Sequence, residues 1–117
     1  MTPAPIKATI AKTVIDQIDI RIGTIESAMP VPGSGKLVSL LVDFGDHKRT
    51  ILSGMQQERP DLGVLQGKQA LFVVNLEPRK MAGILSEGML FDIGYEDGIL
   101  PALATPERPV PNGSRAG

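Results

Sequence analysis

The 117-residue sequence contains no cysteine, which excludes disulfide bonds, thiolate catalysis and zinc sites built on cysteine. Tryptophan is absent too, and one tyrosine and three phenylalanines leave little material for a row of base-stacking side chains like that of a single-strand binder. The formal net charge of −1 provides no basic excess. Any binding of phosphates must therefore use a local cationic patch, and a structured partner recognised by its shape is favoured.

Long apolar runs are also missing from the sequence. No stretch approaches the roughly 20 apolar residues that a membrane helix needs, so we expect no membrane insertion. Residues 1–7 do not form a basic segment followed by an apolar one, and thus do not resemble a secretory signal. We therefore expect a cytoplasmic protein whose length suits a single domain with one core.

The chemistry-bearing residues form no pattern that indicates catalysis. Residues 33–36 suggest a nucleotide-binding loop, but such a loop requires glycine where Pro30 stands and a hydroxyl where Leu37 stands. His47, the single histidine, has no evident second ligand or nucleophile, and it is interpreted as a surface residue. No paired-carboxylate motif occurs among the acidic residues. We expect no catalytic residue, no metal site and no cofactor.

Alternating apolar residues and frequent turn residues predict a series of short strands. The first strand is expected from Ile18, with a phase shift at Gly23-Thr24 that indicates a β-bulge. Further strands are expected at residues 36–44, 49–53, 70–74, 88–93 and 99–103, and the first three form an antiparallel meander. A short helix is expected within residues 9–16, and residues 55–67 permit at most one helical turn. This pattern predicts an all-β fold of the small-barrel type.

Two adjacent cations make residues 75–83 the most informative stretch of the sequence. The segment leaves an apolar run, turns at a proline and presents Arg79 and Lys80 on a bend beside the predicted sheet. Phosphate oxygens prefer cationic donors in fixed positions, and arginine offers them a planar fork of N–H groups. The alternative is a solvated bend, since surface cations are abundant. Lys48 and Arg49 would extend the patch, although a charged, soluble hairpin tip is the favoured interpretation for them.

Four ordered motifs together resemble the OB-fold tRNA-binding domain: Asp19-Ile20-Arg21-Ile22-Gly23, Asn75-Leu76-Glu77-Pro78-Arg79-Lys80-Met81, Ser86-Glu87-Gly88-Met89-Leu90 and Pro109-Val110-Pro111-Asn112-Gly113. That family includes free-standing dimeric tRNA-binding proteins, the C-terminal domain of methionyl-tRNA synthetases and the export-related chaperone CsaA. The resemblance implies a five-stranded Greek-key OB barrel at residues 14–104. It also implies an N-terminal extension at 1–13 and a C-terminal extension at 105–117 that packs on the barrel or on a dimer seam.

The resemblance further implies a tRNA site on matched positions of this sequence. The implied site residues are Lys36, Asn75, Arg79, Lys80, Ser86 and Met89. Two departures lower the expected tRNA affinity, because Ala82 stands where the family often has arginine and residues 33–35 stand where it often has Asn-Ala-Asp. Ser86 is equally well explained as the start of a strand, and Met89 is favoured as a core residue.

The resemblance to free-standing members implies a homodimer, with a seam sealed by apolar residues such as Ile6, Ile10 and Val14. The expected function is non-catalytic recognition of structured tRNA through a local cationic rim. A chaperone for unfolded export clients is the alternative, and the two departures add weight to it. A scaffold that docks an aminoacyl-tRNA synthetase or another protein is a third possibility.

Overall fold

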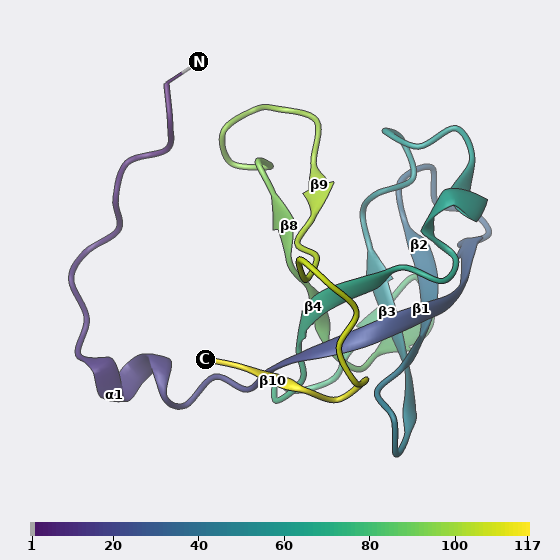
Figure 1. Ribbon diagram of the computed structural model, residues 1–117. Coiled ribbons are helices and arrows are strands. Elements are labelled where there is room, and N and C mark those ends of the chain that lie inside the picture. The colour runs from purple at the N-terminus through teal and green to yellow at the C-terminus, as the bar shows by residue number, and fades with distance from the viewer. Residues whose placement is uncertain (1) are drawn as a thin grey trace.

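Short strands dominate the computed structural model, which describes residues 2–117. Met1, where the expected N-terminal extension begins, lies outside the described residues. The elements in chain order are α1 (Lys12–Ile15), β1 (Ile20–Pro30), β2 (Val38–Asp43), β3 (Lys48–Ser53), the 3-10 helix η1 (Leu62–Leu65), β4 (Gln69–Val73), β5 (Arg79–Met81), β6 (Ile84–Ser86), β7 (Met89–Leu90), β8 (Asp92–Ile93), β9 (Ala102–Leu103) and β10 (Arg115–Ala116). The main sheet curls into part of a barrel (Figure 1), which confirms the predicted all-β OB-type fold.

Strand β1 organises the sheet, whose order is β3-β2-β1-β4-β7 with β10 paired to the start of β1. All of these pairs are antiparallel, and the predicted β1-β2-β3 meander is confirmed. The predicted 88–93 strand is divided into β7, which pairs with β4, and β8, which pairs with β9. The 3-10 helix η1 is the short helical turn that residues 55–67 were expected to permit.

The predicted bulge at Gly23-Thr24 is in the wrong place. The register shift in the β1–β2 pair lies between Ile25 and Ser27, whereas Gly23 and Thr24 pair regularly with β4. Gly23 has a different purpose, because a Cβ atom there would lie 2.4 Å from Cγ1 of Val42. The glycine allows β1 and the end of β2 to approach each other closely.

The core fills the inside of the curled sheet with residues that alternate along its strands. In β2 the side chains of Val38, Leu40 and Val42 are fully buried while Leu41 points outward, as a half-buried strand requires. Phe72 of β4 and Phe44 meet edge to face with ring centroids 5.5 Å apart. The other buried members of this cluster are Ile25, Ile51, Met55, Leu65, Ala70 and Leu90.

A second, smaller apolar cluster fastens β5 and β6 to the barrel. It contains Val31, Leu37 and Leu52, and Met81 and Ile84 pack against it from the two strands of the β5–β6 hairpin. The cluster therefore links this hairpin to the loop between β1 and β2.

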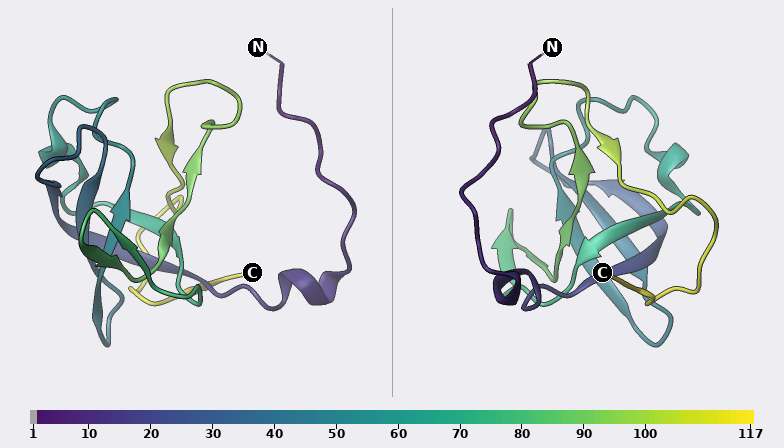
Figure 2. Two further views of the ribbon diagram at one scale, coloured as in Figure 1. Left: turned by 180° about the vertical axis from the view of Figure 1, so that it is seen from behind. Right: turned by 60° about the vertical axis from the view of Figure 1, so that its left-hand side comes forward.

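The C-terminal segment, residues 105–117, lies along the barrel before β10 joins the sheet (Figure 2). Gln69 donates from Nε2 to the carbonyl of Val110 at 2.6 Å, and the Thr24 hydroxyl donates to Oδ1 of Asn112 at 2.7 Å. These polar side chains of β1 and β4 hold the segment by side-chain hydrogen bonds in addition to the short β10 pairing.

Residues 2–18 stand away from the barrel as an extended arm that contains α1 (Figures 1 and 2). The helix expected within 9–16 is limited to four residues, none of which is buried, so no tertiary packing extends it. Near the far end of the arm, the backbone N–H of Ala4 donates to Oδ1 of Asp97, in the connection between β8 and β9. Within residues 2–117, no helix is long and apolar enough to cross a membrane.

Candidate nucleic-acid interface

Arg79 and Lys80 lie on a β-hairpin, and the predicted bend is wrong. Strands β5 and β6 pair with Arg79 opposite Ser86 and Lys80 opposite Leu85. Ala82 and Gly83 connect the strands with φ angles of 49° and 80°, the two positive values that a tight hairpin turn requires. We call residues 79–86 the cationic hairpin.

The strand geometry separates the two cations from each other. Successive side chains of a strand point to opposite faces, so Arg79 shares a face with Met81 while Lys80 points to the other face. Both cations are exposed. Arg79 and Lys80 thus present positive charge on two sides of one ribbon, where the sequence predicted two charges on one bend.

A recess beside the hairpin collects three of the six predicted site residues. Arg79, Ser86 and Met89 line it together with Leu52, Leu76, Glu77, Met81 and Gly88. Most of these residues are apolar, and the charged members are Arg79 and Glu77. We call it the hairpin recess, and its chemistry suits the flat, partly apolar face of a base or sugar better than phosphate alone.

Ser86 has a structural role in the barrel. Its side chain is buried, with the residue 4% exposed, and Oγ accepts a hydrogen bond from the N–H of Leu52 at 3.0 Å. The same hydroxyl donates to the carbonyl of Gly88 at 3.2 Å. Of the two interpretations left open by the sequence, these contacts favour the structural one.

Met89 is 43% exposed and lines the hairpin recess, so its predicted place in the core is wrong. The reason is its register, because Met89 pairs with Val73 at the end of β4 and its neighbour Leu90 takes the buried position. The exposed thioether is thereby available to a partner.

Asn75 joins the barrel to the arm. Its amide nitrogen donates to the carbonyl of Gln17 at 2.7 Å, and its amide oxygen accepts from the N–H of Asp19 at 2.8 Å. Both contacts use the side chain on backbone groups more than 50 residues away. Lys36 is exposed in the β1–β2 loop, directly before Leu37 of the apolar cluster that holds the cationic hairpin.

The charges around the hairpin are not neutralised internally. Within the described part of the chain, no carboxylate forms an ion pair with Lys36, Arg79 or Lys80. By contrast, Lys48 pairs with Glu26 at 3.0 Å. The unpaired cations make the hairpin side of the barrel available for anions.

Asp19 lies between two guanidinium groups at the start of β1. Hydrogen bonds from Arg21, at 2.9 Å, and from Arg115, at 3.2 Å, lower the pKa of this carboxyl from the ordinary 3.8 to about 2. Arg21 and Arg115 are therefore already engaged by one carboxylate. Arg21 also donates to the carbonyl of Gly113 at 3.2 Å.

Arg49 is a residue whose importance the sequence did not indicate. Its guanidinium reaches away from the β2–β3 turn to the backbone carbonyls of Val74 and Glu87, at 2.6 and 3.1 Å. The expected role as a soluble hairpin tip is wrong for Arg49, since these contacts are part-buried. Partners 25 and 38 residues distant leave no signal in the local sequence.

Among residues 2–117, no group of three or more histidine, aspartate and glutamate side chains could hold a metal ion. His47 contacts Asp46 through Nδ1 at 2.6 Å and accepts from Nε of Arg49 at 2.9 Å. Its ring thus has oriented partners, which the sequence did not reveal.

Comparisons with known proteins agree with this geometry. Residues 20–115 match the model of the putative tRNA-binding domain family. The methionine–tRNA ligase of Parabacteroides distasonis is 43% identical over 111 residues, covering 94% of this chain, and the chain spans only 16% of the length of that relative.

Solved structures are similar over nearly the whole chain. The crystal structure of a MetRS-related protein from Pyrococcus horikoshii matches with a TM-score of 0.87 and 33% identity, covering 95% of this chain and all of that one. The chaperone CsaA from Bacillus anthracis matches with a TM-score of 0.80 and 26% identity, covering 94% of this chain and all of that one. The family match covers most of the strands and the cationic hairpin, and the chain belongs to the putative tRNA-binding domain family.

Proposed function

We propose that this chain is a non-catalytic tRNA-binding module that contacts structured tRNA through the cationic hairpin and the hairpin recess. The observation that carries the proposal is the hairpin itself, which presents Arg79 and Lys80 on two faces of a ribbon with no ion pair to any carboxylate of residues 2–117. Membership of the family and the similarity to methionine–tRNA ligases support tRNA as the ligand. A net charge of −1 restricts phosphate contacts to this local patch.

The test is charge reversal on each face of the hairpin. Arg79→Glu, Lys80→Glu and the double variant should fold like the parent protein, because both side chains are exposed. Each lost phosphate contact should flatten the dependence of log affinity on log salt by about 0.7 to 0.9, measured with a tRNA transcript at several salt concentrations.

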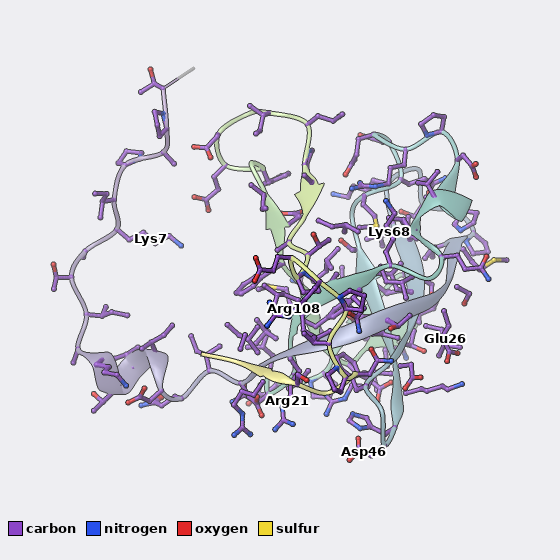
Figure 3. All side chains as sticks on the ribbon, in the orientation of Figure 1. Lys7, Arg21, Glu26, Asp46, Lys68 and Arg108 are labelled. Atoms are coloured by element: carbon purple, nitrogen blue, oxygen red, sulfur yellow. The ribbon has the colours of Figure 1, made fainter. Side chains whose placement is uncertain are left out.

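Lys68→Glu combined with Arg108→Glu is the matched control for the double variant. It makes the same change in net charge at two exposed positions, both labelled in Figure 3. Lys68 and Arg108 line a different groove of the barrel. We expect tRNA affinity to fall far less in this control. Equal loss in the two double variants would show a non-specific charge effect and contradict the hairpin as the site.

We also propose that the module acts as a homodimer through its arm and the β8–β9 region. Ile6 is fully exposed on the arm, and Tyr95 and Leu100 are 75% and 71% exposed between β8 and β9. Apolar side chains exposed to water on these two neighbouring segments favour a second copy of the chain as the partner that buries them. The arm of each copy would then pack against the apolar residues of the other copy. The remaining exposed apolar residues of these segments are Ile10, Val14, Ile15, Ile18, Ile93 and Ile99.

The dimer is tested on the arm. Ile6→Asp with Ile10→Asp should convert a dimer to a folded monomer in sedimentation experiments at micromolar concentration, since neither side chain contributes to the core. Thr9→Asp, at another exposed arm position, is the control and should remain dimeric. A parent protein that sediments as a monomer would refute this part of the proposal.

A chaperone that holds unfolded polypeptides is the second candidate, and the same exposed apolar residues and the similarity to CsaA favour it. Holding by apolar burial is not weakened by added salt. If the chain acts in this way, suppression of the aggregation of a heat-denatured enzyme should survive the Arg79→Glu, Lys80→Glu double variant, and tRNA affinity of the parent should be negligible.

A further inference from the structure

Arg49 connects the two ends of the segment that carries the cationic hairpin. A single guanidinium nitrogen, Nη1, donates to the carbonyl of Val74 at 2.6 Å and to that of Glu87 at 3.1 Å. Val74 directly precedes the loop to the hairpin, and Glu87 directly follows it. One side chain of β3 thus joins the residue before segment 75–86 to the residue after it.

Neighbouring contacts make the Glu87 end a firm attachment. The N–H of Glu87 donates to the carbonyl of Thr50 at 2.9 Å, and the Glu87 carboxylate accepts from the N–H of Thr50 at 3.2 Å. Within residues 2–117, Arg49, the residue before Thr50, forms the only hydrogen bond from this strand to Val74. The Arg49 guanidinium thus joins the two ends by side-chain hydrogen bonds, in addition to the β4–β7 pairing of Val73 with Met89 beside them.

His47 contacts the Arg49 guanidinium from the turn between β2 and β3. Its Nε2 accepts a hydrogen bond from Nε of Arg49 at 2.9 Å, while Nδ1 lies 2.6 Å from a carboxylate oxygen of Asp46. The imidazole stacks on Phe44, with ring centroids 5.5 Å apart and planes inclined by 21°, and Phe44 also lies 5.9 Å beneath the guanidinium carbon. Because Phe44 is a buried core residue, both rings and the guanidinium have a fixed support.

The hydrogen-bond pattern requires a neutral imidazole. A nitrogen that accepts from Arg49 cannot carry a proton, whereas the imidazolium ion has an N–H at both positions. Protonation would remove the acceptor and place a second cation against the guanidinium. The charged groups that face His47 are Asp46 and Arg49 from the same hairpin, and Asp19 and Arg21 from the start of β1, across a shared recess (Figure 3 labels Arg21 and Asp46). The carboxylate of Asp46, 2.6 Å from Nδ1, would keep the imidazolium in place after Arg49 is displaced.

We propose that Arg49 is a positioning residue for the cationic hairpin and that protonation of His47 releases it, so that tRNA binding through the hairpin weakens in mildly acidic solution. This inference rests on the proposed function for its binding readout and on the geometry of residues 44–49 for its mechanism. The predicted direction of the change in tRNA affinity with pH distinguishes this mechanism from a simple charge effect. Added positive charge ordinarily strengthens the binding of nucleic acid, and here it should weaken it.

The mechanism can be tested on the free protein, without RNA. Amide resonances of residues 79–86 should shift between neutral and mildly acidic pH, together with the resonances of the His47 ring. In His47→Gln the side-chain amide supplies an oxygen acceptor for Arg49 at every pH, and the shifts should disappear. If the amide resonances of residues 79–86 do not change when His47 is protonated, the mechanism is wrong.

Binding of a tRNA transcript gives the second readout. We expect the parent protein to lose about tenfold in affinity over the same pH range, equivalent to about 1.4 kcal/mol, and His47→Gln to lose little. Arg49→Lys keeps the charge but has no planar fork to join two carbonyls, and it should bind about tenfold more weakly at neutral pH. Lys48→Gln is the matched control, since it removes a charge from the adjacent exposed position and should change affinity less than about threefold.

The outcomes separate this inference from the proposed function. A parent protein that binds no tRNA, but whose hairpin amides titrate with His47, would refute the proposed function and support the positioning role. A parent protein that binds tRNA with an affinity that rises on acidification, or an Arg49→Lys variant that binds like the parent, would overturn the positioning role. If Arg49→Lys does not fold, His47→Gln still decides the question.

Discussion

Replacing Ser86 by alanine separates the structural role of this position from a role in binding. The hydroxyl accepts from the N–H of Leu52 at 3.0 Å and donates to the carbonyl of Gly88 at 3.2 Å. Both Ser86 and Leu52 are buried, at 4% and 5% exposure. Removal of the oxygen therefore leaves a buried amide of β3 without its partner, while the deletion of one small atom changes the packing little.

The expected cost follows from the burial of that amide. A buried donor left without an acceptor destabilises a protein by about 1 to 3 kcal/mol. For a chain of 117 residues, each kcal/mol corresponds to roughly 4 °C in Tm, so we expect Tm to fall by about 4 to 12 °C. The tRNA affinity of the folded protein should stay within about threefold of the parent, a change of less than about 1 kcal/mol.

Thermal unfolding by circular dichroism and tRNA binding well below Tm would test both parts. Ser53→Ala is the matched control, because Ser53 lies partly exposed in the same strand as Leu52 and its hydroxyl makes no hydrogen bond to the residues that the structure describes. We expect Ser53→Ala to unfold within about 2 °C of the parent, as surface substitutions do. An unchanged Tm in Ser86→Ala, together with a loss of tRNA affinity, would refute the structural role.

Two further predictions concern β1. Gly23→Ala should lower Tm strongly, because the new Cβ would lie 2.4 Å from Cγ1 of Val42. Gly35→Ala should not, because its Cβ would meet no atom within 4 Å from the described residues other than its chain neighbours. The lowered pKa of Asp19, held mainly by the hydrogen bond from Arg21, predicts stability that is present above pH 3.8 and is lost as the pH falls towards about 2; urea unfolding at several acidic pH values should show this loss in the parent and less of it in Asp19→Asn.

The strands that could be predicted from the sequence are those with a local apolar pattern. Alternation in residues 36–44 is visible because every second residue of β2 fills the barrel, and the apolar run at 70–74 matches β4. The all-β fold follows from these patterns, and the family resemblance supplied the OB type.

The cationic hairpin could not be predicted in the same way. Its turn contains Ala82 at a positive φ, where a hairpin signal would have asparagine or aspartate before the glycine, and its strands are only three residues long. The side-chain contacts of Asn75, Ser86 and Arg49 join residues 25 to 58 positions apart. Such contacts form only when the barrel closes, and local sequence patterns do not predict them.

The pairing of β1 on both sides has a consequence for how the chain acquires its structure. The first residues of β1 meet β4 about 50 residues later and β10 about 95 residues later, with Ile20 opposite both Val73 and Ala116. Closing such long loops lowers the entropy of the chain before stabilising contacts form. We therefore expect folding in the millisecond-to-second range typical of small barrels. During synthesis β1 would leave the ribosome long before either partner exists. Arg21, between the apolar Ile20 and Ile22, places a charge on this unpaired edge until β4 and β10 have been made.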